Sequence, residues 1–425
     1  MKEDFLHFLW QYKLFDSSNL KSINNEVIQI VKSGILNKHT GPDFFNAQLK
    51  INNQLWVGNV EIHINSSDWY LHKHEEDENY DAVILHVVWQ HDHEVFMKNN
   101  KPMPTLELKP LIDESLLNNY QNLFSKQLRW IPCEKQLKSV DSFLINNWLE
   151  RLYIERLENK STLIKELLIK TNNNFEAVLF LLLAKNFGLK INGDAFLRLA
   201  ESFDFSVLRK TRFEEQQLSA LLFGQAGFFE SDLEDEYFTQ QKKEYYYLQH
   251  KFNLKPISKN QFQFFRMRPS NFPTIRIAQL VALFFKHQNL FSKLIALKKI
   301  EDFYNLFSVE VNDFWKVHYT FETESKKSSK KLTKSFIDLL LINTIVPLKF
   351  VYEQNRGVVN EIHIFKLLQQ IKPEKNSIIS KFSDLKLTAK NAFESQALLE
   401  LKNNYCAKKR CLQCAIGNDL LRDFT

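Results

Sequence analysis

The pattern of hydrophobic and polar residues along the chain changes near residue 110. Before that point, short apolar runs of strand length alternate with polar turns. The clearest pair, at 44–51 and 55–64, is joined by Asn52 and Asn53, which predicts a β-hairpin. Residues 82–89 are apolar almost throughout, which is typical of a strand buried on both faces of a sheet. The other predicted elements are a helix at 5–15, a strand at 27–31, a helix within 66–80 and an edge strand at 104–108.

From about residue 114 onward, apolar residues recur at a spacing of three and four, which predicts helices. The clearest helical segments are 148–170, 175–187, 218–229, 275–285, 335–345 and 361–371. No internal repeat accompanies them, so a solenoid is not predicted. We therefore expect an α+β protein, with an N-terminal α/β domain built on a mixed sheet over residues 1–112 and a large, mainly helical region over residues 113–425.

Composition narrows the classes of protein that fit this pattern. The 425 residues include 9 glycines and neither of the glycine-rich phosphate-binding motifs, which excludes Rossmann and P-loop domains. The longest apolar runs fall short of the ~18 residues that a membrane span needs, and the N-terminus has no signal-peptide core. We therefore expect a cytoplasmic protein that does not bind membranes. The net charge of +6 is compatible with DNA or RNA as a partner and leaves protein partners open.

Side chains of the kind that bind metals concentrate in the N-terminal part. Seven of the 12 histidines fall between residues 39 and 93, and they share this window with many carboxylates. The histidines are His39, His63, His72, His74, His86, His91 and His93, and the carboxylates include Asp43, Glu61, Asp68, Asp77, Asp81 and Asp92. Such a concentration indicates a metal site or an acid–base site.

Strand periodicity sharpens this prediction. Alternation with apolar residues places Glu61 and His63 on one face of their strand, and the hairpin brings Asp43 close to both. We expect Asp43 and Glu61 to hold Mg²⁺ or Mn²⁺, ions that prefer oxygen ligands. His63, together with His72, would orient or deprotonate a water molecule. The residues expected to contact a substrate here are Asp68, Trp69 and His74.

Three other interpretations of these residues stay open. The spacing of His72, His74 and Asp77 resembles part of the metallo-β-lactamase zinc motif, although it is one residue off and lacks the final histidine. His72, His74 and His86 are alternatively a ligand set for a structural zinc ion. In the third interpretation, a buried hydrogen-bond network without catalysis is formed by Glu61, Asp68, Trp69 and His72.

The four cysteines of the chain form a second candidate site. Cys406, Cys411 and Cys414 lie close together near the C-terminus, and the C-x2-C spacing lets two thiolates reach one tetrahedral centre. Cys133 would complete a set of four, which suits zinc or a [4Fe–4S] cluster. Such a site would be structural, because metal binding supplies folding free energy. The alternative is a set of ordinary buried thiols.

A third candidate lies in the helical region. Arg268 and Arg276 flank a proline-containing loop before a helix that begins near Thr274, and a helix N-terminus beside arginines is a reasonable anion site. We expect both arginines to contact substrate, with pairing to carboxylates as the structural alternative. The basic run KKSSKKLTK at 326–334 is either a solvated loop or a loop that contacts phosphate.

Pro42 and Asp43, followed by Glu61, Ile62 and His63, resemble the active-site motif of the PD-(D/E)XK nuclease superfamily. This resemblance implies a restriction-endonuclease-like N-terminal domain. In such a domain, Asp43, Glu61 and the carbonyl of Ile62 would bind the metal, and His63 would occupy the position of the usual lysine.

Longer strings are similar to a bacterial family, domain of unknown function 2851, over nearly the whole chain. They are GPDFFNAQL from Gly41, GNVEIHINSSDWYLHKH from Gly58, YDAVILHVVW from Tyr80, RPSNFPTIRIAQL from Arg268 and YCAKKRCLQCAIG from Tyr405. This family implies no activity. We therefore expect a Mg²⁺- or Mn²⁺-dependent phosphodiesterase or nuclease acting on nucleic acid. The alternative is a non-catalytic nucleic-acid-binding or scaffold protein with a nuclease-like fold and a structural four-cysteine metal site.

Overall fold

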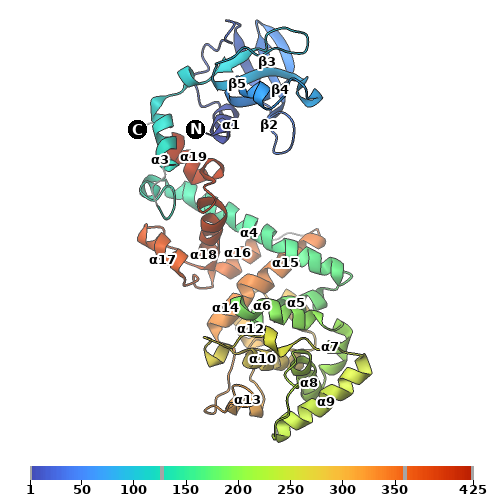
Figure 1. Cartoon of the computed structure of the whole chain (residues 1–425). Helices are drawn as coiled ribbons and strands as arrows, with labels where there is room; N and C mark the ends of the chain where they lie inside the picture. Colours follow the sequence, from blue (N-terminus) through green and yellow to red (C-terminus); the bar gives the residue numbers. More distant parts are fainter. Residues whose placement is uncertain (1, 125–128, 358–360, 423–425) are drawn as a thin grey trace. The chain divides into compact units, whose positions relative to one another are not determined.

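The computed structural model describes residues 2–124, 129–357 and 361–422, and it confirms the predicted α+β class. The chain forms two compact units: unit 1 consists of residues 1–148 together with 401–425, and unit 2 of residues 149–400. Unit 1 is therefore discontinuous in sequence, and the expected division at residue 112 lies inside it. Figure 1 shows strands in the N-terminal part of the chain and helices through the rest.

Unit 1 contains a six-stranded mixed sheet with the order β1-β3-β4-β5-β6, and the short β2 also pairs with β3. The strands are β1 (Ile28–Lys32), β2 (Ile35–Leu36), β3 (Phe44–Ile51), β4 (Gln54–Asn65), β5 (Val83–Gln90) and β6 (Thr105–Glu107). β1, β3 and β4 are antiparallel neighbours, whereas β5 runs parallel to β4, and β6 parallel to β5. All five predicted strands are present; β2 is too short to give a sequence pattern.

Asn52 and Asn53 form the predicted turn between β3 and β4. Both have positive φ angles, 48° and 67°, as a two-residue type I′ turn requires, and Ile51 pairs with Gln54 across it. Further along the hairpin, Phe44 pairs with Val60. The register therefore brings the residues just before β3 next to the centre of β4.

β4 and β5 form the buried centre of the sheet. In their parallel register, Glu61 lies opposite His86, among apolar residues that are buried on both faces. Gly58 allows this close pairing, because a Cβ atom there would lie 2.4 Å from Cγ2 of Ile84. A glutamate and two histidines are thereby buried within an apolar sheet, since His63 follows on β4.

Helices near the sheet differ in part from the predicted ones. α1 (Glu3–Tyr12) packs next to β4, and it is shorter than the predicted helix at 5–15. The segment at 66–80 contains two short helices, α2 (Asp68–Leu71) and η1 (Glu78–Tyr80). Lys73 has a φ of 59°, and a residue in this left-handed region does not continue a right-handed helix.

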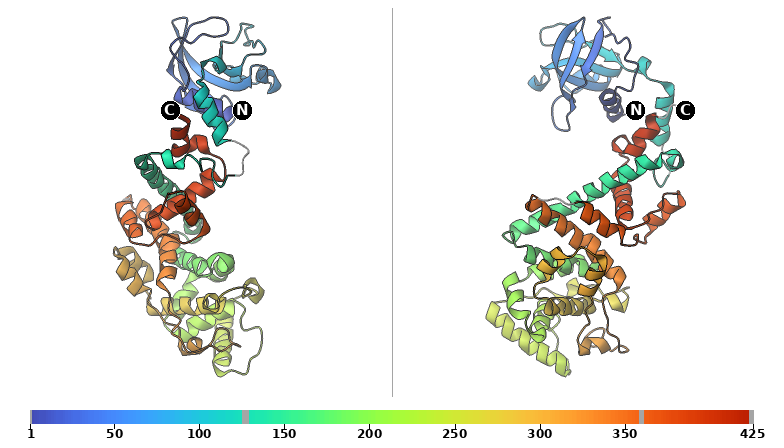
Figure 2. Two further views of the ribbon diagram at one scale, coloured as in Figure 1. Left: turned by 90° about the vertical axis from the view of Figure 1, so that its left-hand side faces the viewer. Right: turned by 180° about the vertical axis from the view of Figure 1, so that it is seen from behind.

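The C-terminal segment of the chain completes unit 1. Its elements are η7 (Leu401–Cys406), η8 (Cys411–Gln413) and α19 (Ala415–Arg422). α19 packs against α3 (Glu114–Leu123), and Figures 1 and 2 show these two helices side by side although they lie far apart in sequence. The other elements of unit 1 are η2 (Lys109–Leu111), η3 (Leu137–Ser139) and the first part of α4 (Ser142–Lys170).

Unit 2 is built from helices. After the remainder of α4 they are α5 (Phe175–Phe187), α6 (Leu189–Glu201), α7 (Phe205–Thr211), α8 (Glu215–Gln225), α9 (Glu236–Phe252), η4 (Lys259–Gln261), η5 (Pro269–Asn271), α10 (Pro273–Lys286), α11 (Leu290–Ala296), α12 (Ile300–Leu306), α13 (Asp313–Val317), α14 (Lys334–Leu340), η6 (Leu341–Ile345), α15 (Val346–Asn355), α16 (Glu361–Gln369), α17 (Ser377–Asp384) and α18 (Ala392–Glu400). Each predicted helical segment corresponds to one or two of these. α9 was not predicted, because it buries one narrow stripe and is otherwise polar.

One long helical stretch of unit 2 is unusually apolar. Within the described residues, Lys334–Asn355 is the single stretch long and apolar enough to cross a membrane. Of its most apolar window, 67% is buried inside the protein, as is usual for a core helix.

Candidate metal centre

Asp43 and Glu61 are linked across the β3–β4 hairpin. The backbone N–H of Asp43 donates to Oε2 of Glu61 at 3.1 Å, and the backbone N–H of Ile62 donates to Oδ2 of Asp43 at 2.9 Å. The Glu61 side chain is buried. The hairpin thus brings the two predicted carboxylates together, and each has one oxygen held by the backbone of the opposite strand.

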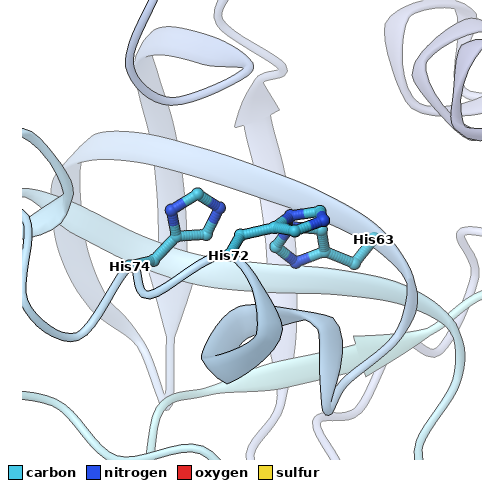
Figure 3. Close-up of side chains that lie close together, drawn as sticks. All are labelled: His63, His72 and His74. Carbon is cyan, nitrogen blue, oxygen red and sulfur yellow. The ribbon is translucent and has the colours of Figure 1, made fainter.

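The other carboxylate oxygen of Glu61 faces two imidazoles. Oε1 lies 3.3 Å from Nε2 of His74 and 3.5 Å from Nε2 of His63. The same Nε2 of His63 lies 3.1 Å from Nδ1 of His72. Ligand nitrogens of the three histidines all lie within 4.8 Å of one another, and Figure 3 shows the three side chains gathered beside β4.

These separations fit the ligands of one metal ion. Two ligand atoms that each lie ~2.1 Å from a tetrahedral ion are about 3.4 Å apart, and the distances from Glu61 Oε1 to the two Nε2 atoms are 3.3 Å and 3.5 Å. His63, His72 and His74 therefore form a candidate centre of three nitrogens, and the Oε1 atom of Glu61 adjoins His63 and His74 as a further oxygen ligand for the same space. Such a mixed set suits manganese, zinc or iron better than magnesium.

Burial shifts the pKa values of Glu61 and His63 in this cluster. It raises the pKa of Glu61 to about 7, although the hydrogen bond from His74 opposes the change. Burial and the neighbouring imidazoles lower the pKa of His63 to about 2. His63 therefore stays neutral, with a lone pair available for a cation, and a cation would offset the cost of burying the Glu61 carboxylate.

His86 lies behind His63. Nε2 of His86 is 2.9 Å from Nδ1 of His63, and the His86 side chain is 0% exposed. A histidine that binds a metal commonly uses its second ring nitrogen in this way, which fixes the orientation of its ring. From the sequence, one proposed set of zinc ligands was His72, His74 and His86. In the structure, the third histidine close to His72 and His74 is His63.

α1 contributes two residues that the sequence analysis missed. Nε2 of His7 lies 3.2 Å from Oδ2 of Asp43. Burial alone would lower the pKa of His7, but the contact with Asp43 outweighs burial, so the pKa of His7 is raised. Glu3 lies one helical turn earlier, and burial followed by the charge of Asp43 raises its pKa. The available signal was the spacing of Glu3 and His7, four residues apart and therefore on the same side of a helix.

A cavity of about 440 Å³ adjoins the cluster. His74 lines this cavity together with Trp69, Tyr80 and the loop at 96–100. Tyr80 stacks on His74, with ring centroids 3.7 Å apart. Because His72 is exposed, the candidate centre faces solvent on one side and this cavity on another.

Other residues predicted in this region have contacts that stabilise the local fold. Oδ2 of Asp68 accepts the backbone N–H of Asn65 at 2.9 Å. Trp69 is buried, and it packs in a small apolar cluster under the cavity. Asp77, the last residue of the metallo-β-lactamase-like spacing, accepts the N–H of Asn79 and caps η1.

The four cysteines lie in unit 1 and line one small cavity. None of them forms a disulfide. No three of their sulfur atoms, all of which are in the described part of the chain, lie within 4.8 Å of one another. The fold therefore gathers the predicted set at a spacing wider than that of ligands around one ion.

Arg276 is 7% exposed and lies in unit 2 at the start of α10. Its guanidinium donates to Oε1 of Gln279 at 2.9 Å and to Oδ1 of Asn271 at 2.6 Å, and it lies 3.6 Å from the ring centroid of Phe336. Burial lowers its pKa to about 10. The sequence offered an ion pair with a carboxylate as the alternative role of this arginine. Among the described residues, the partners of Arg276 are an amide on each side and an aromatic ring.

A cavity of about 310 Å³ brings Arg268 and Arg276 together. Lys330 and Lys331 of the basic run also line it, so this run forms part of a cavity wall. None of the described residues around this cavity is acidic. Both lysines already have partners, since Nζ of Lys331 lies 2.6 Å from Oε1 of Glu310 and Nζ of Lys330 donates to the carbonyls of Trp315 and His318. The two arginines are the groups of this cavity that suit an anion.

The fold and the site together show the class of protein. It is an α+β protein whose N-terminal mixed sheet carries a candidate metal centre. The chain belongs to the family described as "Protein of unknown function (DUF2851)", whose model matches residues 3–377. The match includes the candidate metal centre and both arginines, and it ends before the C-terminal cysteines. No curated protein and no solved structure matches the chain.

Proposed function

We propose that unit 1 is a metal-dependent phosphodiesterase, a nuclease acting on nucleic acid, in which Glu61, His63, His72 and His74 surround the ion. The observation that carries this proposal is the approach of Oε1 of Glu61 to two imidazole nitrogens, at 3.3 Å and 3.5 Å. A buried carboxylate and imidazoles at ligand spacing, open to solvent and to a cavity, are the parts of a catalytic metal site, which keeps one position free for water or substrate.

The order of elements supports phosphodiester chemistry. Asp43 precedes one strand of a hairpin, Glu61 lies in the other, and a short helix and a buried parallel strand follow. This order agrees with the resemblance to the PD-(D/E)XK nucleases. His63 stands in place of their lysine, and as a nitrogen ligand it favours Mn²⁺ or Zn²⁺ over Mg²⁺.

Each residue of the cluster has a part in this proposal. A bound divalent ion would polarise a phosphate oxygen and lower the pKa of a water molecule. Glu61 supplies the negative charge, and the three imidazoles complete the ligand set. Asp43 positions Glu61 through its own backbone N–H, and His7 and Ile62 hold the Asp43 carboxylate in turn.

Positive charge supports an anionic substrate. The chain carries a net charge of +6. In unit 2, Arg268, Arg276 and two lysines line a cavity without an acidic residue among its described walls. Phosphate contacts from arginine and lysine supply much of the affinity of proteins for nucleic acid.

Cleavage of labelled single- and double-stranded DNA and RNA, with Mn²⁺, Zn²⁺ or Mg²⁺, tests this proposal. We expect cleavage with Mn²⁺ or Zn²⁺ that falls by roughly 100-fold or more in Glu61→Gln and His74→Asn, the scale of losing one group that stabilises charge in a transition state. The matched control, Glu76→Gln, changes an exposed carboxylate of the same loop and should keep full activity. Equal cleavage by all four proteins would reveal a contaminant and contradict the proposal.

The hydrogen bonds of the hairpin favour a second candidate, a non-catalytic nucleic-acid-binding or scaffold protein. Asp43 and Glu61 each have an oxygen bound by backbone of the opposite strand, as in a network that only stabilises a fold. Equilibrium dialysis with Mn²⁺ and Zn²⁺ separates the two. One bound ion per chain that is lost in Glu61→Gln supports the enzyme, and a folded protein that binds DNA but no ion supports the scaffold.

A further inference from the structure

Two segments that are distant in sequence bring all four cysteines of the chain to one small cavity in unit 1. Cys133 precedes η3, whereas Cys406, Cys411 and Cys414 belong to the C-terminal segment. Three of them are buried, and Cys406 is half-buried. Because none is oxidised to a disulfide, four thiols face the same space.

We propose that this cavity binds a [4Fe–4S] cluster, with one thiolate from each cysteine. A single zinc ion with Zn–S bonds of ~2.3 Å holds its sulfurs about 3.8 Å apart. In the structure, no three of the four sulfurs lie within 4.8 Å of one another. In a [4Fe–4S] cluster each thiolate binds a different iron, so the sulfurs stand further apart than around one ion. The wider spacing therefore fits the cluster.

The four thiols are still close enough to influence one another. Burial, together with neighbouring thiols, raises the pKa of Cys133 and of Cys411 to about 12. Burial and the three other cysteines likewise raise the pKa of Cys406.

The remaining wall of the cavity suits a buried anionic cluster. Its apolar residues are Ile131, Leu137, Leu401 and Ile416. Cys414 directly precedes α19, and the backbone N–H groups of Ile416 and Gly417 face its sulfur. N–H groups that face a thiolate stabilise its negative charge, and hydrogen bonds to the sulfurs adjust the potential of a cluster.

Gly417 makes the close approach of α19 possible. A Cβ atom at this position would lie 2.2 Å from the carbonyl oxygen of Cys411. Any larger residue would push α19 away from η8, and with it Cys414 away from Cys411. The short connection between η8 and α19 therefore needs glycine at position 417 to bring Cys411 and Cys414 to one cavity.

Outside the cavity, Lys402 joins the two segments, and one further contact stabilises each segment internally. Nζ of Lys402 donates to the carbonyl of Trp130 at 2.5 Å and lies 4.7 Å from the centroid of its ring. The backbone N–H of Trp130 donates to Oε2 of Glu134 at 2.8 Å. Arg410 lies over the ring of Tyr405, with its Cζ 4.9 Å from the centroid. The ligand loops are therefore positioned by the protein itself, and the cluster would join the C-terminal segment to residues 130–137.

Metal analysis of the full chain tests this proposal without any measurement of cleavage. The protein is purified under nitrogen, reconstituted with Fe²⁺ and sulfide, and analysed for iron, sulfide and zinc. We expect about four irons and four sulfides per chain and a broad visible absorbance that bleaches on reduction. One zinc per chain without iron, retained in His74→Asn and lost in Cys133→Ser, would overturn the cluster in favour of a single ion. Four titratable thiols in a folded chain that takes up no metal would overturn the metal site.

Substitution of single cysteines tests whether the cluster binds in this cavity. Cys133→Ser and Cys411→Ser should lose most of the iron, whereas Gln413→Ala, which changes an exposed side chain between two ligands, should retain it. Unchanged iron in both serine variants would refute the assignment. If a serine variant fails to fold, the wild type still decides the question: removal of iron with a chelator should lower the midpoint of thermal unfolding, and reconstitution should restore it.

Discussion

His63 and His86 face each other across the parallel strands β4 and β5, with Nδ1 of His63 2.9 Å from Nε2 of His86. His86 is 0% exposed, so water cannot take over this contact. The imidazole of His63 is therefore oriented by the sheet before an ion binds. A ligand fixed in advance loses little conformational freedom when the ion arrives.

Replacement of His86 tests this relationship. We expect His86→Leu to weaken Mn²⁺ or Zn²⁺ binding by about 10- to 100-fold, because the partner that orients His63 is lost. Competition against a chromophoric chelator measures the affinity. His93→Leu is the matched control, since His93 is exposed and has no contact with the cluster among its described interactions. Equal affinities in wild type and His86→Leu would mean that His63 needs no support from His86.

Glu61→Gln should stabilise the metal-free protein at high pH. Burial raises the pKa of Glu61 from 4.5 to about 7, so between these values the folded protein holds a proton that the unfolded chain releases. This contribution to stability is full below pH 4.5 and is lost as the pH rises through 7. At pH 8 the variant should exceed the wild type by at most roughly 3 kcal/mol in free energy of unfolding.

Urea unfolding in the presence of a chelator, at pH 5 and pH 8, measures this difference. The advantage of Glu61→Gln should shrink at pH 5, where the wild-type carboxyl is protonated in the folded protein. The buried histidines are the same in both proteins, so their titration cancels. A wild type that is the more stable protein at pH 8 would mean that the hairpin stabilises the charged carboxylate.

Arg268→Gln should weaken DNA binding through the loss of one phosphate contact. The slope of log affinity against log salt concentration should fall by about 1, and the loss should be similar for all sequences. Fluorescence anisotropy with short labelled DNA, repeated at several salt concentrations, measures this slope. Arg266→Gln is a close control, because Arg266 is exposed two residues earlier and does not line the cavity. Equal slopes for both variants would remove Arg268 from the binding surface.

Gly417→Ala should loosen the contact between α19 and η8. The added methyl group would overlap the carbonyl of Cys411, and overpacking of this kind costs about 1–3 kcal/mol. Hydrogen exchange followed by mass spectrometry should show faster exchange in α3 and α19, with unit 2 as the internal control. Unchanged exchange in α19 would mean that the loop at 406–414 adjusts to the added group.

The strands were predictable because their signals are local. The asparagine turn and the apolar runs at 44–51 and 82–89 predict strands from neighbouring residues alone. α2 was harder to predict, because a lysine in the left-handed region, Lys73, ends it, and lysine gives no such signal. The pairing of α3 with α19 within unit 1 is a tertiary contact between distant segments, which local sequence patterns do not encode.

The candidate site was predictable in its composition and less so in its geometry. Alternation along β4 correctly brought Glu61, His63 and Asp43 together, since strand period and hairpin register determine those positions. The approach of His74 to Glu61 depends on the short helices after β4, and that of His7 on the packing of α1. Neither arrangement follows from local sequence.

The discontinuity of unit 1 has a consequence for synthesis on the ribosome. The sheet and α3 are made first, the whole of unit 2 follows, and α19 comes last. Nascent domains generally fold in the order in which they emerge, so the face of α3 that α19 covers stays open while unit 2 is translated. A chain arrested before residue 401 would contain the entire sheet, yet it would expose that face and a solitary Cys133. A chain that lacks the segment after residue 400 therefore differs from the full sequence in one uncovered helix of unit 1.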